Sequence, residues 1–165
     1  MTDDLHTIYM RMAIRQAQAA LEEGEVPTGC VIVRSSPELA AGQGRLIGRA
    51  HNQVELLKDP TAHAEILAIT QAAQAVGDWR LTDTVLYVTK EPCAMCAGAI
   101  VLARIPVVVF GTPDPQRGGA VSVFNILQHP NLNHRCEVIA DVLADECRAL
   151  LQDFFRQRRA APRLD

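Results

Sequence analysis

The sequence predicts an α/β fold of three layers, in which helices cover both faces of a mixed central sheet. Segments of helical and strand periodicity alternate in the order α-β-β-α-β-α-β-(β)-α. An expected hairpin and an expected β-α-β unit require antiparallel and parallel pairing in one sheet. The 165 residues contain no repeat or linker, so we expect a single domain over residues 1–165.

Each element is predicted from apolar spacing and from the residues at its ends. Apolar side chains at intervals of three and four indicate helices, and short apolar runs between turn residues indicate strands. Gly24 and Gly77 end two helices, and Asp59-Pro60 supplies a capping side chain and a first-turn proline. The predicted helices cover residues 5–23, 59–77, 93–103 and 144–159, the predicted strands cover 30–33, 45–50, 84–89, 107–110 and 136–140, and long loops are expected at 35–44 and 111–125.

Composition narrows the class of protein. Hydrophobic residues make up 48% and charged residues 21%, which is typical of a globular protein. No apolar run approaches the roughly 20 residues that span a bilayer, so we expect no membrane partner. Acids stand near the N-terminus where a signal peptide has basic residues, and five cysteines are too irregular for a disulfide framework. These features favour a cytoplasmic location.

The net charge of −3 argues against nucleic-acid binding through an overall basic surface. Any such site must be local, and arginines are concentrated near the C-terminus. They are Arg148, Arg156, Arg158, Arg159 and Arg163. The alternative is a solvated helix face with no nucleic-acid partner.

Two short fragments contain candidate metal ligands, HAE at 63–65 and PCAMC at 92–96. Cys93 and Cys96 stand three residues apart, so one helical face presents both thiols, and the helix N-terminus favours the thiolate. His63 would be a third ligand, which leaves a fourth tetrahedral position for water, as in catalytic zinc sites. We therefore expect one Zn²⁺ ion held by His63, Cys93 and Cys96.

Glu65 is the candidate proton carrier. A regular helix would point His63 and Glu65 to opposite sides, so only their place at a helix start allows both to face one metal ion. There Glu65 would take a proton from a zinc-activated water and pass it to the substrate. The alternative is a carboxylate that merely favours its helix N-terminus.

Longer segments carry a family resemblance: EVPTG at 25–29, DPTAHAE at 59–65, EPCAMCAGAI at 91–100, FG at 110–111 and NHR at 133–135. From about Tyr9 to Arg159 the chain resembles the bacterial tRNA-specific adenosine deaminases of the cytidine deaminase superfamily. The resemblance implies a cytidine-deaminase-like fold and a homodimer. It also implies conversion of the wobble adenosine to inosine in the anticodon arm of an arginine tRNA, with release of ammonia.

The resemblance also implies substrate-binding positions. It assigns Asn52 to contact with a flipped base, Pro27 and Gly29 to the loop beside the pocket, Asp114 to a loop that contacts the anticodon, and Phe155 and Arg156 to a C-terminal helix that helps hold the anticodon loop. The chain departs from the family pattern at Thr28, Cys30 and Lys90, and its 35–44 loop is longer.

The zinc motif does not exclude a second enzyme class, and the departures at Thr28 and Lys90 leave the fine choice of substrate open. Deaminases of free guanine, cytosine or a pyrimidine nucleotide would use the same metal and carboxylate. The arginines beside Phe154 and Phe155 favour RNA, since unstacked bases are bound by stacking and local cations. A zinc-stabilised interaction module without activity would require a closed metal shell and another use for Glu65.

Overall fold

The structure is a computed structural model that describes residues 4–35 and 43–162. Most of the expected 35–44 loop, and Arg163, therefore lie outside the described residues. A five-stranded sheet has the strand order β2-β1-β3-β4-β5. The strands are β1 (Gly29–Ser35), β2 (Gly44–His51), β3 (Thr84–Lys90), β4 (Val107–Thr112) and β5 (Glu137–Ile139).

Strand pairing confirms that the sheet is mixed. β1 pairs antiparallel with both β2 and β3, whereas β3 pairs parallel with β4 and β4 pairs parallel with β5. The helices are α1 (Leu5–Glu22), α2 (Val54–Leu57), α3 (Ala64–Val76), α4 (Ala94–Leu102) and α5 (Ala144–Ala160). Among the described residues, no helix is both long and apolar enough to cross a membrane.

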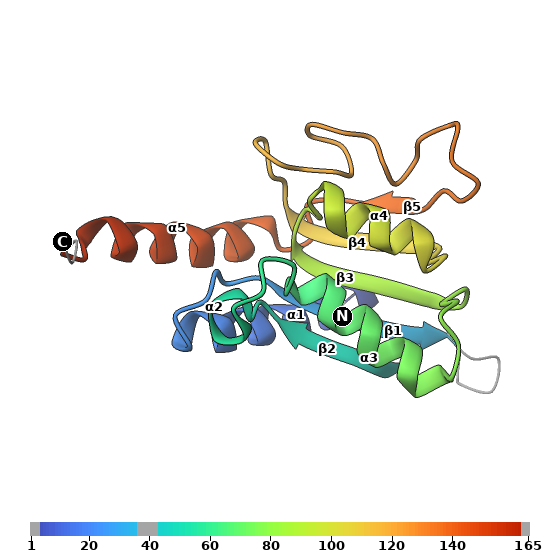
Figure 1. Cartoon of the computed structure of the whole chain (residues 1–165), viewed down its shortest axis with the longest axis horizontal. Coiled ribbons are helices and arrows are strands. Elements are labelled where there is room, and N and C mark those ends of the chain that lie inside the picture. Colours follow the sequence, from blue (N-terminus) through green and yellow to red (C-terminus); the bar gives the residue numbers. More distant parts are fainter. Residues whose placement is uncertain (1–3, 36–42, 163–165) are drawn as a thin grey trace.

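Alternation along the strands creates two cores, one on each face of the sheet. Cys30 and Ile32 of β1 are buried together with residues of α3 and α4. Val31 and Val33, which point to the other face, are buried together with residues of α1 and α5. Figure 1 shows α3 and α4 in front of the sheet and α1 behind it. The three-layer α/β/α prediction is confirmed.

The helix expected to start at Asp59 begins later, at Ala64. Asp59 instead closes a local turn, because its Oδ1 accepts hydrogen bonds from the backbone N–H and the hydroxyl of Thr61 at 2.8 and 2.7 Å. That turn competes with helix formation. The expected start was therefore wrong, and His63 lies just outside α3. The four-residue α2 was not predicted.

Close packing of β2 on α3 fixes the helix that follows His63. A Cβ atom added to Gly48 of β2 would lie 2.6 Å from the carbonyl oxygen of Ala68 in α3. Only glycine allows two backbones to approach so closely. The position of α3 on the sheet therefore depends on a residue without a side chain.

We expect Gly48→Ala to lower the free energy of unfolding by about 1–3 kcal/mol, because the added methyl overpacks the interface. Gly98→Ala is the matched control, since a Cβ at this position in α4 meets no atom within 4 Å. It should be neutral or stabilise the protein by about 0.5–1 kcal/mol through helix propensity. Urea denaturation of both variants measures the contrast, and equal effects would contradict it.

Candidate active site

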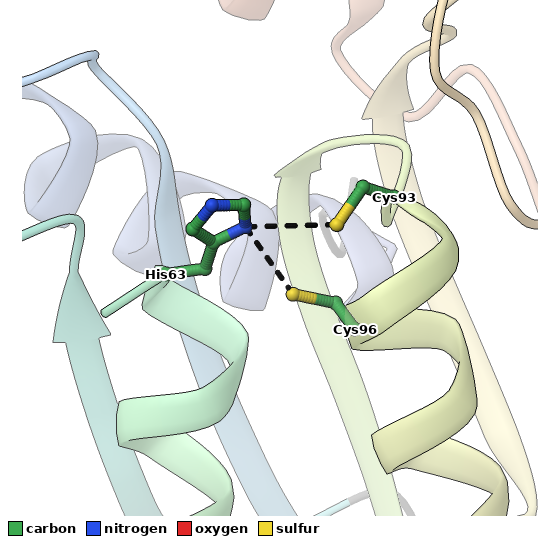
Figure 2. A group of neighbouring side chains, drawn as sticks. All are labelled: His63, Cys93 and Cys96. Atoms are coloured by element: carbon green, nitrogen blue, oxygen red, sulfur yellow. Dashed lines mark hydrogen bonds between the residues drawn. The ribbon is translucent and has the colours of Figure 1, made fainter. Parts of the chain in front are cut away.

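Three potential metal ligands meet at one end of the sheet. Donor atoms of His63, Cys93 and Cys96 lie within 4.8 Å of one another, and no other such group occurs among residues 4–35 and 43–162. His63 Nδ1 is 3.6 Å from Cys93 Sγ and 3.5 Å from Cys96 Sγ. Figure 2 shows the imidazole ring pointing toward both sulfurs.

Two helix starts bring the ligands together. His63 is the N-cap residue of α3 with φ −75° and ψ 152°, and Cys93 is the N-cap residue of α4 with φ −68° and ψ 173°. Both residues thus have extended backbones immediately before a helix. Since His63 lies outside the helical spiral, the helical spacing that would separate it from Glu65 does not apply.

The donor set fits a zinc ion. Zinc bonds of about 2.3 Å to sulfur and about 2.0–2.1 Å to nitrogen, at a tetrahedral angle, separate the two donor atoms by roughly 3.5–3.6 Å. The two His63–sulfur distances match this value. A hydrogen bond from Cys96 lowers the pKa of Cys93, and the nearby imidazole lowers it further, although burial opposes both. The cluster therefore favours at least one thiolate.

Glu65 lies in the first turn of α3 and is almost fully buried. Burial raises the pKa of Glu65, and neighbouring groups, including His63 and Cys96, offset this only in part. A carboxyl group with a raised pKa is suited to both accepting and donating a proton. The structure thus brings the predicted proton carrier and the three predicted ligands together.

Asn52 supports the same helix start from a distant part of the chain. The backbone N–H of Ala64 donates to Asn52 Oδ1 at 2.9 Å, while the His63 side chain makes no capping hydrogen bond. Asn52 therefore satisfies a free N–H of α3 that a local cap would otherwise bind. Its assignment to base contact stays a prediction.

Pro27 and Gly29 are both buried, Gly29 as the first residue of β1 and Pro27 two residues before it. Gly29 packs on α1, because an added Cβ would overlap the backbone of Ala13 and Ala17. This close approach gives Gly29 a reason in packing that is independent of any substrate. The proposed place of the two residues beside the pocket is not tested by these contacts.

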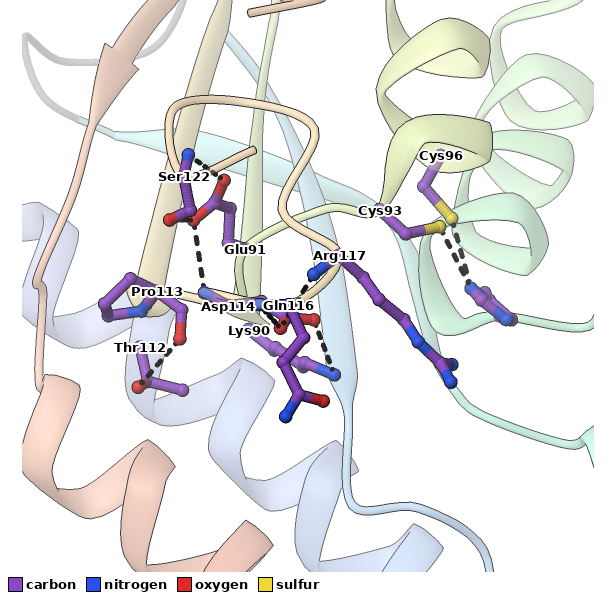
Figure 3. A network of polar contacts seen from close by, with 11 residues as sticks. Lys90, Glu91, Cys93, Cys96, Thr112, Pro113, Asp114, Gln116, Arg117 and Ser122 are labelled. Atoms are coloured by element: carbon purple, nitrogen blue, oxygen red, sulfur yellow. Dashed lines mark hydrogen bonds and ion pairs between the residues drawn. The ribbon is translucent and has the colours of Figure 1, made fainter. Parts of the chain in front are cut away.

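Asp114 lies in the loop after β4, where Lys90 at the end of β3 binds it. Lys90 Nζ is 3.0 Å from Asp114 Oδ2, and the other carboxylate oxygen accepts the backbone N–H groups of Gln116 and Arg117 (Figure 3). Burial would raise the pKa of Asp114, but these partners outweigh burial and lower it. The departure from the family pattern at Lys90 thus provides an ion-pair partner for Asp114.

Glu91 was not identified from the sequence, although it directly precedes Pro92 and Cys93. Its buried carboxylate accepts hydrogen bonds from the Asp114 backbone and from Ser122 (Figure 3). It also accepts the backbone N–H groups of Ala120 and Val121. Burial opposes ionisation, but the hydrogen bonds from Ser122 and its neighbours lower the pKa of Glu91. The available signal was an acidic residue at a buried strand end.

Glu25 is a second buried carboxylate that sequence patterns did not reveal. It accepts the backbone N–H groups of Glu55 at 3.1 Å and Leu56 at 2.8 Å, and so caps the short helix α2. The loop 24–28 is thereby tied to the segment that follows Asn52. An acidic residue two positions before Pro27, in an otherwise turn-like stretch, was the only signal.

The C-terminal helix separates the two aromatic residues. Phe154 is buried, whereas Phe155 is 45% exposed. Arg156 pairs with Asp153 on its own helix, while Arg158 reaches Glu55 of α2 at 3.8 Å. Figure 1 shows the C-terminal part of α5 projecting past the sheet, away from the starts of α3 and α4. The structure does not bring Phe155 and Arg156 to the metal ligands.

Comparisons with known proteins decide the family. A family model described as MafB19-like deaminase matches residues 4–159. A tRNA-specific adenosine deaminase of Bacillus subtilis strain 168 is 46% identical over 159 residues, which covers 96% of this chain and 92% of the relative. The chain is a member of the tRNA-specific adenosine deaminase family.

Other similarities agree with this family. A tRNA-specific adenosine deaminase of Aquifex aeolicus strain VF5 is 47% identical over 151 residues, or 92% of this chain and 94% of the relative. A solved structure from a study of A-to-I editing by tRNA:A34 deaminases is 39% identical, with a TM-score of 0.80. The matched region covers 88% of this chain and 99% of the chain in the solved structure. The cytidine-deaminase-like fold is confirmed.

Proposed function

We propose that this family member is a zinc-dependent hydrolase that converts adenosine to inosine at the wobble position of a tRNA, with an arginine tRNA anticodon arm as substrate. The observation that carries the proposal is the open group of His63, Cys93 and Cys96 beside a buried Glu65. Three protein ligands, rather than four, are typical of a catalytic zinc site. Family membership selects adenosine in tRNA over a free base.

Glu65 would carry protons between water and the base. A zinc ion bound by the three ligands supplies the positive charge that makes a neighbouring water acidic. The Glu65 carboxylate accepts the water proton and delivers it to N1 of adenine as the oxygen adds to C6. It then transfers the second proton to the departing amino group, so that ammonia leaves and a C6 carbonyl remains. Water and adenosine thus balance inosine and ammonia.

The other predicted contacts belong to this proposal. Asn52, Pro27, Gly29 and Asp114 would surround the flipped nucleotide, with Asn52 on the base and Asp114 in the loop that meets the anticodon. Phe155, with its exposed ring, and Arg156 would contact RNA further from the metal group. The homodimer and the cytoplasmic location, both expected from the sequence, remain predictions.

A parallel assay separates adenosine in tRNA from free bases. Purified protein is incubated with an arginine tRNA anticodon stem-loop, free guanine and cytidine, and inosine and ammonia are followed. We expect rapid formation of inosine in the stem-loop and little ammonia from the other two compounds. Faster release of ammonia from guanine or cytidine would overturn the choice of substrate.

The metal and proton roles are tested by two contrasting variants. Cys93→Ser should lose zinc and activity together, because it removes one of three ligands. Glu65→Ala should keep its zinc while deamination falls about 10²- to 10⁴-fold, as expected for a general acid-base residue. Elemental analysis and turnover distinguish the variants. Normal turnover without Glu65, or full zinc content without Cys93, would contradict the assignments.

The role of the last helix in RNA binding is tested by changing Arg156, Arg158 and Arg159 together to alanine. The variant should keep its fold and zinc but bind the stem-loop more weakly. The slope of log affinity against log salt concentration should become shallower by about one for each lost phosphate contact. The matched control changes Arg34, Arg45 and Arg80, which are also exposed.

In this control the net charge changes equally, while the arginines lie elsewhere. Arg34 and Arg45 face each other at the end of the β1–β2 hairpin opposite Gly29 and His51. We expect the control to keep its affinity and salt slope. Equal losses in both triple variants would indicate a general charge effect, and no loss in the first would assign the arginines to the solvated surface.

A further inference from the structure

Glu91 is a buried carboxylate that has no part in the proposed proton transfer or metal binding. Its exposed fraction is 2%, and it lies between the end of β3 and the ligand Cys93. One oxygen accepts the Asp114 backbone N–H at 3.2 Å and the Ser122 hydroxyl. The other accepts the N–H groups of Ala120, Val121 and Ser122 at 3.2, 3.0 and 3.0 Å. Five donors therefore converge on one side chain.

These contacts anchor a loop that lacks regular structure. Residues 113–122 form no helix or strand beyond a single bridge, so their N–H groups need other partners. Three consecutive backbone N–H groups around one oxygen form a concave site for an anion. Without the carboxylate, the N–H groups of the buried residues Asp114 and Ala120 would lose their acceptor away from solvent.

The same loop packs on the backbone of the metal ligand. Gly118 forms a bridge with Cys93, and the Gly119 N–H donates to the Pro92 carbonyl at 2.7 Å. A Cβ added to Gly119 would lie 2.8 Å from the Cys93 carbonyl oxygen. The loop therefore contacts the residues on which the extended conformation of Cys93 depends. Glu91 joins the two segments from within.

We propose that Glu91 is a positioning residue, which holds the Cys93 turn and the 113–122 loop as one rigid unit. The inference rests on the metal-binding role proposed above for Cys93. Through this unit, Glu91 fixes the ligand backbone and also the Asp114 backbone, whose N–H it binds. Groups that hold metal ligands in place commonly contribute about 10- to 100-fold to metal affinity. Zinc retention and loop order should therefore change together.

The test compares Glu91→Gln with Glu25→Gln. Both replace a carboxylate of 2% exposure that accepts backbone N–H groups, but Glu25 binds α2 and not the 113–122 loop. Two rates are measured at a temperature where circular dichroism shows all proteins folded. One is the release of zinc to a chelator, and the other is trypsin cleavage between Arg117 and Gly118, followed by mass spectrometry.

We expect Glu91→Gln to release zinc about 10-fold faster or more and to be cut faster after Arg117. Glu25→Gln should match the wild type in both rates, even if its melting temperature falls. Equal rates in the two variants would overturn the proposal. Neither rate depends on the substrate, so an enzyme inactive on tRNA but with the expected rates would overturn only the proposed function.

A milder variant serves if Glu91→Gln does not fold. Ser122→Ala removes one of the five hydrogen bonds and leaves the carboxylate in place. A lost hydrogen bond of ordinary strength should speed cleavage after Arg117 by about 2- to 10-fold, with a smaller rise in zinc release. Unchanged rates in this variant would count against the rigid unit.

Discussion

The starts of α3 and α4 lie side by side at one end of the sheet, and the group of three candidate metal ligands depends on this arrangement. Each helix is preceded by one extended ligand residue, His63 or Cys93, so the side chains leave the helices toward each other. Small buried residues such as Ala64 and Ala97 let the helices pack close to the strands. The positive ends of both helix dipoles then face the thiols of Cys93 and Cys96 and favour the thiolate form.

Around this meeting point, side-chain oxygens satisfy the backbone N–H groups of irregular segments. Asn52 serves α3, Glu25 serves α2, and Asp114 and Glu91 serve the loop after β4. Such segments cannot rely on sheet or helix hydrogen bonds, so acceptors from elsewhere in the chain decide their shape. A site built this way is organised before a substrate arrives, which lowers the cost of reaching a reactive geometry.

Periodicity predicted most elements because apolar alternation in strands such as β1 records burial on two faces. It failed where a local side chain competed with the helix, as at Asp59, and where the element was too short to show a period, as in α2. The ligands and Glu65 could be identified because their spacing is local. Glu91 could not, since its partners lie 23 to 31 residues away and are backbone groups without a sequence signature.

The hydrogen bond between Ala64 and Asn52 limits what the asparagine can offer to a base. The Asn52 Oδ1 atom already accepts the Ala64 backbone N–H, so one lone pair is left for a second donor, whereas Nδ2 can only donate. In the proposed contact of Asn52 with a base, an acceptor such as a ring nitrogen would face Nδ2. A donor such as an exocyclic amino group would have to share Oδ1 with the helix cap. The cap would thus favour one orientation of a purine over the other.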